Sequence, residues 1–183
     1  PLLDRKLWSE PSEVVVNQHN SGKPIFPFVV FTSAESHFMI AEAITKGLAS
    51  GDAQSYYQTG IRKAMSLWDV SSADVENYIA TESMALLNGS TDQNLEKIAT
   101  QRWIALFTNG YEAWSVVRDT GYPTELSAGV TDSDIFVLGD TNGAYPQRHR
   151  YGSGPYNTNG AQVEQANSVQ GPDKQSTKLW WAK

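Results

Sequence analysis

Glu35 and Glu42 are the first carboxyl groups whose spacing suggests chemistry. In a helix, seven residues rise by about 10 Å and bring the two side chains to roughly the same face. Glycoside hydrolysis uses two carboxyl groups about 5 to 10 Å apart, so the spacing alone permits this reaction. However, Glu35 follows Thr32 at the spacing of a helix-capping box, and Glu42 lies between two alanines in a segment suited to close helix packing. We therefore expect both glutamates to be structural rather than catalytic.

The histidines form no recognisable metal or nucleophile motif. The chain has three of them, His19, His37 and His149, and none has a second ligand at the spacing of a metal site. His149 lies between Arg148 and Arg150, a cluster that either binds an anion or pairs with carboxylates, and we favour pairing. The chain contains no cysteine, and it contains no phosphate-binding loop or nucleophile elbow. The sequence therefore predicts no catalytic residue, no metal and no cofactor.

Aromatic side chains outside the helical segments are the candidates for ligand binding. The chain has six Trp and eight Tyr, and rings beyond the needs of a core can stack on sugars or bases. Trp8, Tyr145, Tyr151 and Tyr156 fall where helical periodicity is absent, so we name them as candidate ligand contacts, with packing as the alternative for each. A net charge of −6 argues against nucleic acid as the ligand, because binding its phosphates requires a basic face.

Three segments before residue 80 have the apolar spacing of helices. Thr32 is the predicted N-cap of the first segment, Asp52 of the second, and Ser71 or Ser72 of a shorter third. A short connection makes the first two helices antiparallel neighbours. Small residues late in the first helix and a Tyr pair early in the second resemble one tetratricopeptide unit.

The stretch from 94 to 123 predicts a long helix, a tight joint and a short helix. Thr91 or Asp92 is the predicted N-cap. We expect Gly110, in Asn109-Gly110, to end the first helix as its left-handed residue. Pro123 lacks a backbone N–H, so the second helix must stop before it.

Four side chains of this stretch are predicted to be structural. Trp103 and Trp114 lie on the apolar stripe and are expected to anchor the core. Glu112 opens the second helix and Arg118 closes it, where the helix dipole favours an anion and a cation respectively. We expect Arg118 to hold the outgoing turn at Tyr122.

From Thr124 onward helical periodicity disappears and turn-forming residues become frequent. Only residues 161–167 are predicted to form a helical turn or two. The predicted fold is therefore all-α, with tetratricopeptide-like helical hairpins at 32–123 and an irregular, loop-rich tail at 124–183 that wraps them. The start at Pro1 without an initiator Met leads us to expect that 1–183 is the C-terminal portion of a longer domain.

Five blocks, in order, resemble the motifs of the SusD/RagB family. They are residues 31–43 (FTSAESHFMIAEA), 101–114 (QRWIALFTNGYEAW), 118–123 (RDTGYP), 148–159 with its Arg, Tyr and Asn residues, and 178–181 (KLWW). Their order and spacing make the resemblance specific. It places Glu42, Trp103, Glu112, Trp114 and Arg118 in the family's structural motifs.

Three positions depart from the family pattern. Asp119 stands where a second Arg is common, Gly152 where Pro is common, and Pro155 where an acidic residue is expected. These departures concern the loop around Tyr151 more than the assignment.

The resemblance implies an all-helical fold and a non-catalytic glycan-binding protein of polysaccharide uptake. Such proteins lie at the outer-membrane surface, attach by lipid on an N-terminal Cys that this chain lacks, and cap a SusC-like TonB-dependent transporter. The family's sugar platform lies largely upstream of the segment seen here. Two alternatives remain: a tetratricopeptide-like protein-interaction scaffold without sugar binding, and a glycosidase, for which the sequence offers no constellation.

Overall fold

The computed structural model describes residues 29–182, so Trp8 and His19 lie outside the described residues. The chain divides into two compact units, Pro1–Val30 and Phe31–Lys183. The second unit carries every helix discussed below. Its described residues form helices and connecting loops without a β-strand, which confirms the predicted all-α fold.

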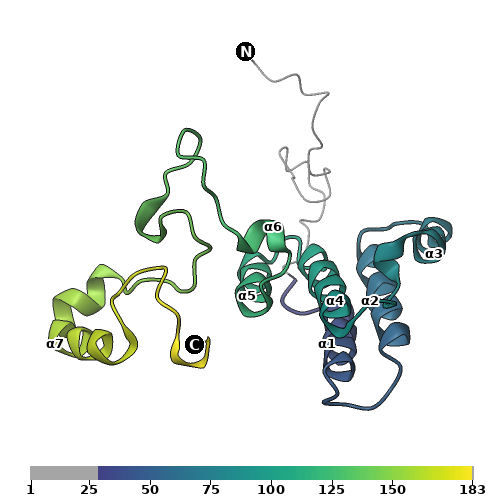
Figure 1. Ribbon diagram of the computed structural model, residues 1–183, viewed down its shortest axis with the longest axis horizontal. Helices are drawn as coiled ribbons and strands as arrows, with labels where there is room; N and C mark the ends of the chain where they lie inside the picture. The colour runs from purple at the N-terminus through teal and green to yellow at the C-terminus, as the bar shows by residue number, and fades with distance from the viewer. Residues whose placement is uncertain (1–28, 183) are drawn as a thin grey trace, which may run out of the picture. The chain divides into compact units, whose positions relative to one another are not determined.

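Five helices make up the predicted helical part (Figure 1). In chain order they are α1 (Ser33–Thr45), α2 (Ala53–Leu67), α3 (Ser72–Thr81), α4 (Thr91–Ala105) and α5 (Gly110–Thr120). Helix α1 packs against both α2 and α4, and α4 packs against α5. A short 3-10 segment, Ser83–Ala85, links α3 to the loop before α4.

Side chains at the N-termini of three helices satisfy backbone groups that the helix leaves unpaired. The Thr32 hydroxyl accepts from the amide of Glu35 at 3.1 Å, and the Asp52 carboxylate accepts from that of Ser55 at 3.3 Å. The Ser71 hydroxyl does the same for α3. The sequence predicted all of these caps. The Glu35 carboxylate, however, does not complete a capping box at Thr32; it pairs with Arg102 instead.

The predicted N-cap of α4 is wrong: Ser90, rather than Thr91 or Asp92, holds this position. The Ser90 hydroxyl accepts from the Gln93 amide at 3.3 Å, and the Gln93 side chain accepts from the Ser90 amide at 2.9 Å. This reciprocal pair satisfies two amides at once, which Thr91 or Asp92 would not do with the residues that follow them.

Replacing Ser90 with alanine should therefore lower the free energy of unfolding by about 1 kcal/mol, because the hydroxyl that accepts from the Gln93 amide is lost. Urea denaturation followed by circular dichroism measures the change. Thr91→Ala is the matched control, since Thr91 is exposed and caps nothing. An equal loss from both substitutions would contradict the capping role of Ser90.

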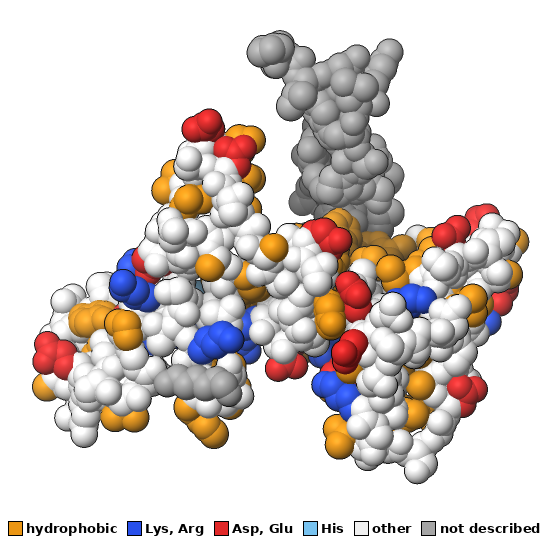
Figure 2. Space-filling view, viewed as in Figure 1, with side chains coloured by type: hydrophobic (Ala, Val, Ile, Leu, Met, Phe, Trp, Pro, Cys, Tyr) orange, Lys and Arg blue, Asp and Glu red, His pale blue; other side chains and the backbone are white. Residues whose placement is uncertain are grey.

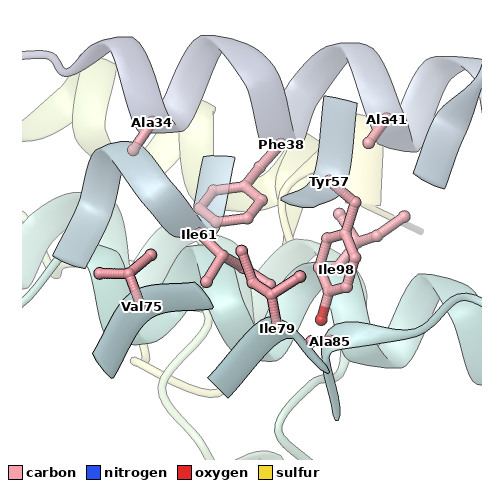
Figure 3. Packing of buried hydrophobic residues seen from close by; sticks show 9 residues of the cluster. All are labelled: Ala34, Phe38, Ala41, Tyr57, Ile61, Val75, Ile79, Ala85 and Ile98. Atoms are coloured by element: carbon pink, nitrogen blue, oxygen red, sulfur yellow. The ribbon is translucent and has the colours of Figure 1, made fainter. Parts of the chain in front are cut away.

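The core of the helical part lies between α1, α2, α3 and α4 (Figure 3). Its buried hydrophobic side chains are Ala34, Phe38, Ala41, Tyr57, Ile61, Val75, Ile79, Ala85 and Ile98. The rings of Phe38 and Tyr57 meet edge to face with centroids 6.0 Å apart. Gly60 lets α1 and α2 approach closely, since a Cβ there would lie 2.7 Å from the Phe38 ring.

The one polar tip in this core is the Tyr57 hydroxyl. It donates to the Met84 carbonyl at 2.5 Å, and the Lys97 carbonyl lies 3.3 Å away. Burial raises the pKa of Tyr57 well above its usual range, so the hydroxyl remains a hydrogen-bond donor. The bond ties α2 to the segment that leads into α4.

The joint between α4 and α5 differs in detail from the prediction. Thr108, not Gly110, adopts the left-handed backbone conformation, with φ of 86°. Asn109 caps α5 by accepting from the Glu112 amide at 3.4 Å, and Gly110 is the first residue of that helix. Helix α5 ends at Thr120, and Gly121 caps it with a left-handed φ of 76°, directly before Tyr122-Pro123, so the helix stops before the proline as predicted.

The tail is more helical than predicted, since α7 spans Ser153–Gln170 (Figure 1). The helical turns expected at residues 161–167 lie within α7, and the helix extends beyond them at both ends. Pro155 lies in the first turn, where its missing N–H would have no partner in the helix. Asn159 has non-helical φ and ψ and kinks the helix, so its apolar spacing is broken. The remainder of the tail holds α6 (Thr124–Ser127) and 3-10 segments at Gly139–Thr141 and Trp180–Ala182.

Candidate functional site

Two of the four predicted ligand-binding residues converge on one carboxylate, that of Asp173. The Tyr156 hydroxyl donates to Asp173 Oδ2 at 2.8 Å, and the Tyr151 amide lies 3.2 Å from both carboxylate oxygens. Tyr151 lies in the loop before α7, whereas Tyr156 lies within α7 and not in a loop, as the sequence had suggested. Among the described residues, Tyr145 has no hydrogen bond or ring contact with this group, and Trp8 lies outside the described residues.

Arg148 forms the base of this group. Its guanidinium donates through Nη2 to Asp173 at 2.9 Å and through Nε to the His149 carbonyl at 3.0 Å. The same guanidinium lies 4.9 Å from the centroid of the Tyr151 ring, a cation–π contact. Both members of the ion pair are buried, with exposed side-chain fractions of 6% for Arg148 and 8% for Asp173.

The rings of this Asp173 group remain partly open to solvent. Tyr151 is 36% exposed and Tyr156 is 43% exposed, while their polar ends are held by Gln170 and Asp173 respectively. Tyr145 is half-buried, and burial raises the pKa of its hydroxyl. Tyr151 and Tyr156 therefore offer fixed rings at the surface, and Tyr145 offers less.

Asp173→Asn should lower the free energy of unfolding by about 2 kcal/mol, because the buried Arg148 would lose its counter-charge while keeping one hydrogen-bond acceptor. It should also speed hydrogen exchange at the Tyr151 amide, which donates to this carboxylate. Asp140→Asn is the control, because Asp140 pairs at 3.6 Å with an Arg150 that is largely exposed. Faster exchange at Tyr151 in the control but not in Asp173→Asn would contradict the assignment.

Trp114 and Arg118 connect α5 to the loop at residues 146–147. The Trp114 indole donates to the Pro146 carbonyl at 2.8 Å, and Arg118 donates to the Gln147 carbonyl at 3.3 Å. The Arg118 guanidinium also lies 4.7 Å from the Trp114 ring centroid. The prediction that Arg118 holds the turn at Tyr122 is wrong, because its guanidinium donates to this loop instead.

The turn after α5 is held by Thr120 instead. Its hydroxyl accepts from the Tyr122 amide at 3.1 Å and lies 2.7 Å from the Val116 carbonyl. Glu112 lies in the first turn of α5, as predicted. Trp103 packs against the second apolar cluster of the chain, formed by Ala99, Leu106 and Val116, so it is a core residue as predicted.

The side chains of Tyr111 and His149 were not identified as a pair from the sequence. Their ring centroids lie 5.8 Å apart, and the His149 centroid also lies 5.3 Å from that of Trp114. The only sequence signal is that Tyr111 falls off the apolar stripe of its helix. The proximity of residues so far apart in the chain carries no local signature.

The two glutamates with catalytic spacing are engaged in ion pairs. Glu35 is buried and accepts from Arg102 at 3.1 Å. Glu42 pairs with Lys46 at 2.5 Å and lies 3.8 Å from Arg102. Neither carboxyl group is free to face a substrate, which supports their structural interpretation.

One surface pocket, of about 570 Å³, lies between the first half of α4 and the loops on either side. Its polar lining comes mainly from Asn88, Gln93, Glu96, Lys97 and Thr100. The Lys97 ammonium is already committed to the Ser83 and Leu86 carbonyls and to Asn88. Because no aromatic ring lines this pocket, it lacks the flat apolar surface on which a sugar stacks.

The described residues carry no other prominent binding chemistry. No cluster of three or more potential metal ligands occurs within residues 29–182. In the same range, no helix combines the length and the apolar character needed to cross a bilayer. Figure 2 shows Lys and Arg side chains in small separate groups on the visible face, without a continuous basic surface.

Comparison with known proteins identifies a family. A family profile described as "SusD-like_2: Starch-binding associating with outer membrane" matches residues 5–151. Among curated protein sequences, no significant match occurs.

Solved structures also match over most of the chain. A SusD-like protein from Bacteroidetes has 28% identity and a TM-score of 0.75, covering 85% of this chain and 30% of its own. A SusD homologue from Bacteroides thetaiotaomicron has 28% identity and a TM-score of 0.67, covering 85% and 38%. A chitin-binding SusD homologue from Flavobacterium johnsoniae has 27% identity and a TM-score of 0.68, covering 82% and 36%. The chain thus spans about a third of the length of these structures.

Proposed function

Because this chain belongs to the SusD-like family, we propose that it takes part in binding carbohydrate, without catalysis, for nutrient uptake at the outer-membrane surface. The family is described as starch-binding and associated with the outer membrane, and two of the matched structures are named as chitin-binding. The chain covers a third of such a protein, so the proposal concerns the share of binding that this segment contributes.

The observation that carries the proposal is the pair of partly open rings at Tyr151 and Tyr156. A pyranose ring has an apolar face of C–H groups, which stacks on an exposed aromatic ring. The Tyr156 hydroxyl is held by Asp173, and the Tyr151 ring is held by Gln170 at its hydroxyl and by the Arg148 guanidinium against its face. Both rings are therefore fixed before a ligand arrives, so less conformational entropy is lost on binding. Trp8 and Tyr145 remain predicted contacts of the same kind.

We propose that the chain is not catalytic because its two candidate carboxylates are already engaged in ion pairs. Glu35 and Glu42 are tied to Arg102 and Lys46, and neither is placed to protonate a glycosidic oxygen. The family description names binding of starch and no reaction, which supports this proposal.

Isothermal titration calorimetry of the full chain against chitohexaose and maltoheptaose tests the proposal. We expect saturable binding to at least one of these oligosaccharides, weakened about five- to tenfold by Tyr151→Ala or Tyr156→Ala, equivalent to about 1 to 1.4 kcal/mol. Phe136→Ala is the control, because Phe136 is an exposed ring in a different loop. The absence of heat with every glycan tested would refute sugar binding and favour the protein-interaction scaffold.

We further propose that the complete protein acts with a SusC-like TonB-dependent transporter and is held at the membrane by a lipid anchor outside this chain. The family description, which includes association with the outer membrane, supports this proposal. Co-expression with such a transporter, followed by purification through a tag on the transporter, tests it. Recovery of the transporter alone would count against the partnership.

A further inference from the structure

We propose that Tyr111 and His149, backed by Trp114, form a second sugar-stacking platform, distinct from the rings held by Asp173. This inference rests on the proposed function and assigns a further binding surface to it. It takes a pyranose ring of a glycan as its ligand. The ring geometry of these residues, their exposure to solvent and their unpaired polar atoms support this role.

The three rings form a chain of contacts, called the row below, because His149 contacts both Tyr111 and Trp114. Its imidazole is 5.8 Å from the Tyr111 centroid at an interplanar angle of 55°, and 5.3 Å from the Trp114 centroid at 54°. Such distances lie within the range of favourable aromatic contacts, so the rings support one another's orientation. The row joins the first turns of α5 to the loop before α7.

The inner end of this row is fixed. The Trp114 indole donates to the Pro146 carbonyl at 2.8 Å, and the Arg118 guanidinium covers the ring at 4.7 Å. Trp114 is half-buried and anchored on two sides, so it acts as a base rather than as a mobile surface ring. A preformed base of this kind lowers the entropic cost of binding.

The outer end of the row is open. Tyr111 is 72% exposed, twice the fraction of Tyr151, and His149 is exposed as well. Within the described residues, neither the Tyr111 hydroxyl nor the His149 ring nitrogens have a hydrogen-bond partner. The platform therefore offers an apolar face together with polar tips that can bond to sugar hydroxyls, the combination that a pyranose ring requires.

The two arginines beside His149 have carboxylate neighbours. Arg148 pairs with Asp173 at 2.9 Å, and Arg150 lies 3.6 Å from Asp140. Arg118 has no carboxylate partner in the described part of the chain, so neutral and acidic sugars both fit the surface.

A second His–Tyr pair in the same chain provides a matched control. His37 and Tyr56 lie 6.0 Å apart with an interplanar angle of 41°, on α1 and α2. His37 Nδ1 is 2.6 Å from the Ser33 carbonyl, and within residues 29–182 no tryptophan ring contacts the pair. If backing by a tryptophan and unpaired ring nitrogens make a His–Tyr pair a platform, the pair at Tyr111 should bind sugar and the pair at Tyr56 should not.

The test is calorimetry of the full chain with chitohexaose, maltoheptaose and a galacturonate oligomer, which separate neutral from acidic ligands. We expect Tyr111→Ala and His149→Ala to weaken binding about tenfold, or about 1.4 kcal/mol. Tyr111→Phe should stay within about twofold, because the stacking face remains, and Tyr56→Ala should leave binding unchanged. Unaltered circular dichroism spectra establish that the variants are folded.

The outcomes separate this inference from the proposed function. If Tyr151→Ala and Tyr156→Ala weaken binding while Tyr111→Ala and His149→Ala do not, the second platform is refuted and the proposed function stands. If the unmodified chain binds none of the three oligosaccharides, both are refuted. Equal losses of affinity from Tyr111→Ala and Tyr56→Ala would also overturn the inference, since Tyr56→Ala should not change binding.

Discussion

Replacing Phe38 with alanine should lower the free energy of unfolding by about 3 to 5 kcal/mol. The ring is fully buried at the centre of the α1–α2 contact, edge-on to Tyr57 and against Gly60 (Figure 3). Removing the ring loses its burial and leaves a cavity, because the backbones of α1 and α2 cannot move close enough together to fill the space. Urea denaturation of the full chain measures the loss. The neighbouring Met39→Ala, at a largely exposed position of the same helix, should change stability far less.

Gly60 tests whether the space around Phe38 is as tight as its geometry suggests. An added Cβ at Gly60 would lie 2.7 Å from Phe38 Cε1 and 2.8 Å from Cδ1. Alanine gains about 1 kcal/mol over glycine in a helix, but overpacking of a core costs about 1 to 3 kcal/mol. Gly60→Ala should therefore destabilise the unmodified chain and stabilise the Phe38→Ala variant. The same change in both backgrounds would show that the ring and Gly60 do not share this space.

The helices of the first half could be predicted because their signals are local. Thr32, Asp52 and Ser71 each stand three residues before the amide they cap, and the apolar spacing that follows marks the buried face. The N-cap of α4 is the exception, because the sequence offers several adjacent residues that could cap the helix. Ser90 follows Gly89 in an apparent turn, and its two bonds with Gln93 distinguish it from Thr91.

Helix α7 could not be predicted from periodicity. Its apolar residues are few, its kink at Asn159 interrupts their spacing, and its only buried residue is Val163. Glycine and proline in the first turn further suggested a loop, although a first turn tolerates both. Where this local signal is weak, the helix is held by a tertiary contact: the hydroxyl of Tyr156, within α7, donates to Asp173, which lies after the helix in the chain.

The candidate site illustrates the same limit. Tyr151 and Tyr156 were chosen as rings outside the helical pattern, but nothing in the sequence joined them to Asp173 or to Arg148. Tyr111 and His149 come from separate segments, and only the fold brings their rings to 5.8 Å. Composition and motif spacing identify the family and the residue types suited to sugar, whereas the grouping of those residues depends on tertiary structure.

Removing Arg102 from its buried ion pair with Glu35 should greatly lower the free energy of unfolding. The Glu35 side chain is 3% exposed, and its distance to Arg102 Nη2 is 3.1 Å. Arg102→Met would leave a buried carboxylate without a counter-charge, which costs about 3 to 5 kcal/mol. Glu42 would suffer less, because it keeps Lys46 at 2.5 Å. Urea denaturation again measures the change.

Removing both partners should cost much less than removing one. Within the described residues, Glu35 Oε2 and Arg102 Nε are buried without any hydrogen-bond partner, so the pair does not fully repay its own desolvation. The double variant Glu35→Met/Arg102→Met should therefore be more stable than Arg102→Met alone and close to the unmodified chain. A double variant as unstable as the sum of the two single variants would contradict this account.

The exposed pair between Arg62 and Glu76 supplies the control for burial. Arg62 donates to both Glu76 oxygens, at 2.7 and 2.9 Å, and these hydrogen bonds lower the pKa of Glu76. Its hydrogen-bond geometry is better than that of the Arg102 pair, but water solvates both partners. Arg62→Met should therefore shift the unfolding midpoint far less than Arg102→Met. Equal shifts from the two substitutions would mean that hydrogen-bond geometry, rather than the desolvation of Glu35, sets the loss of stability. The stability of the α1–α4 contact would then depend less on its buried charge than the structure implies.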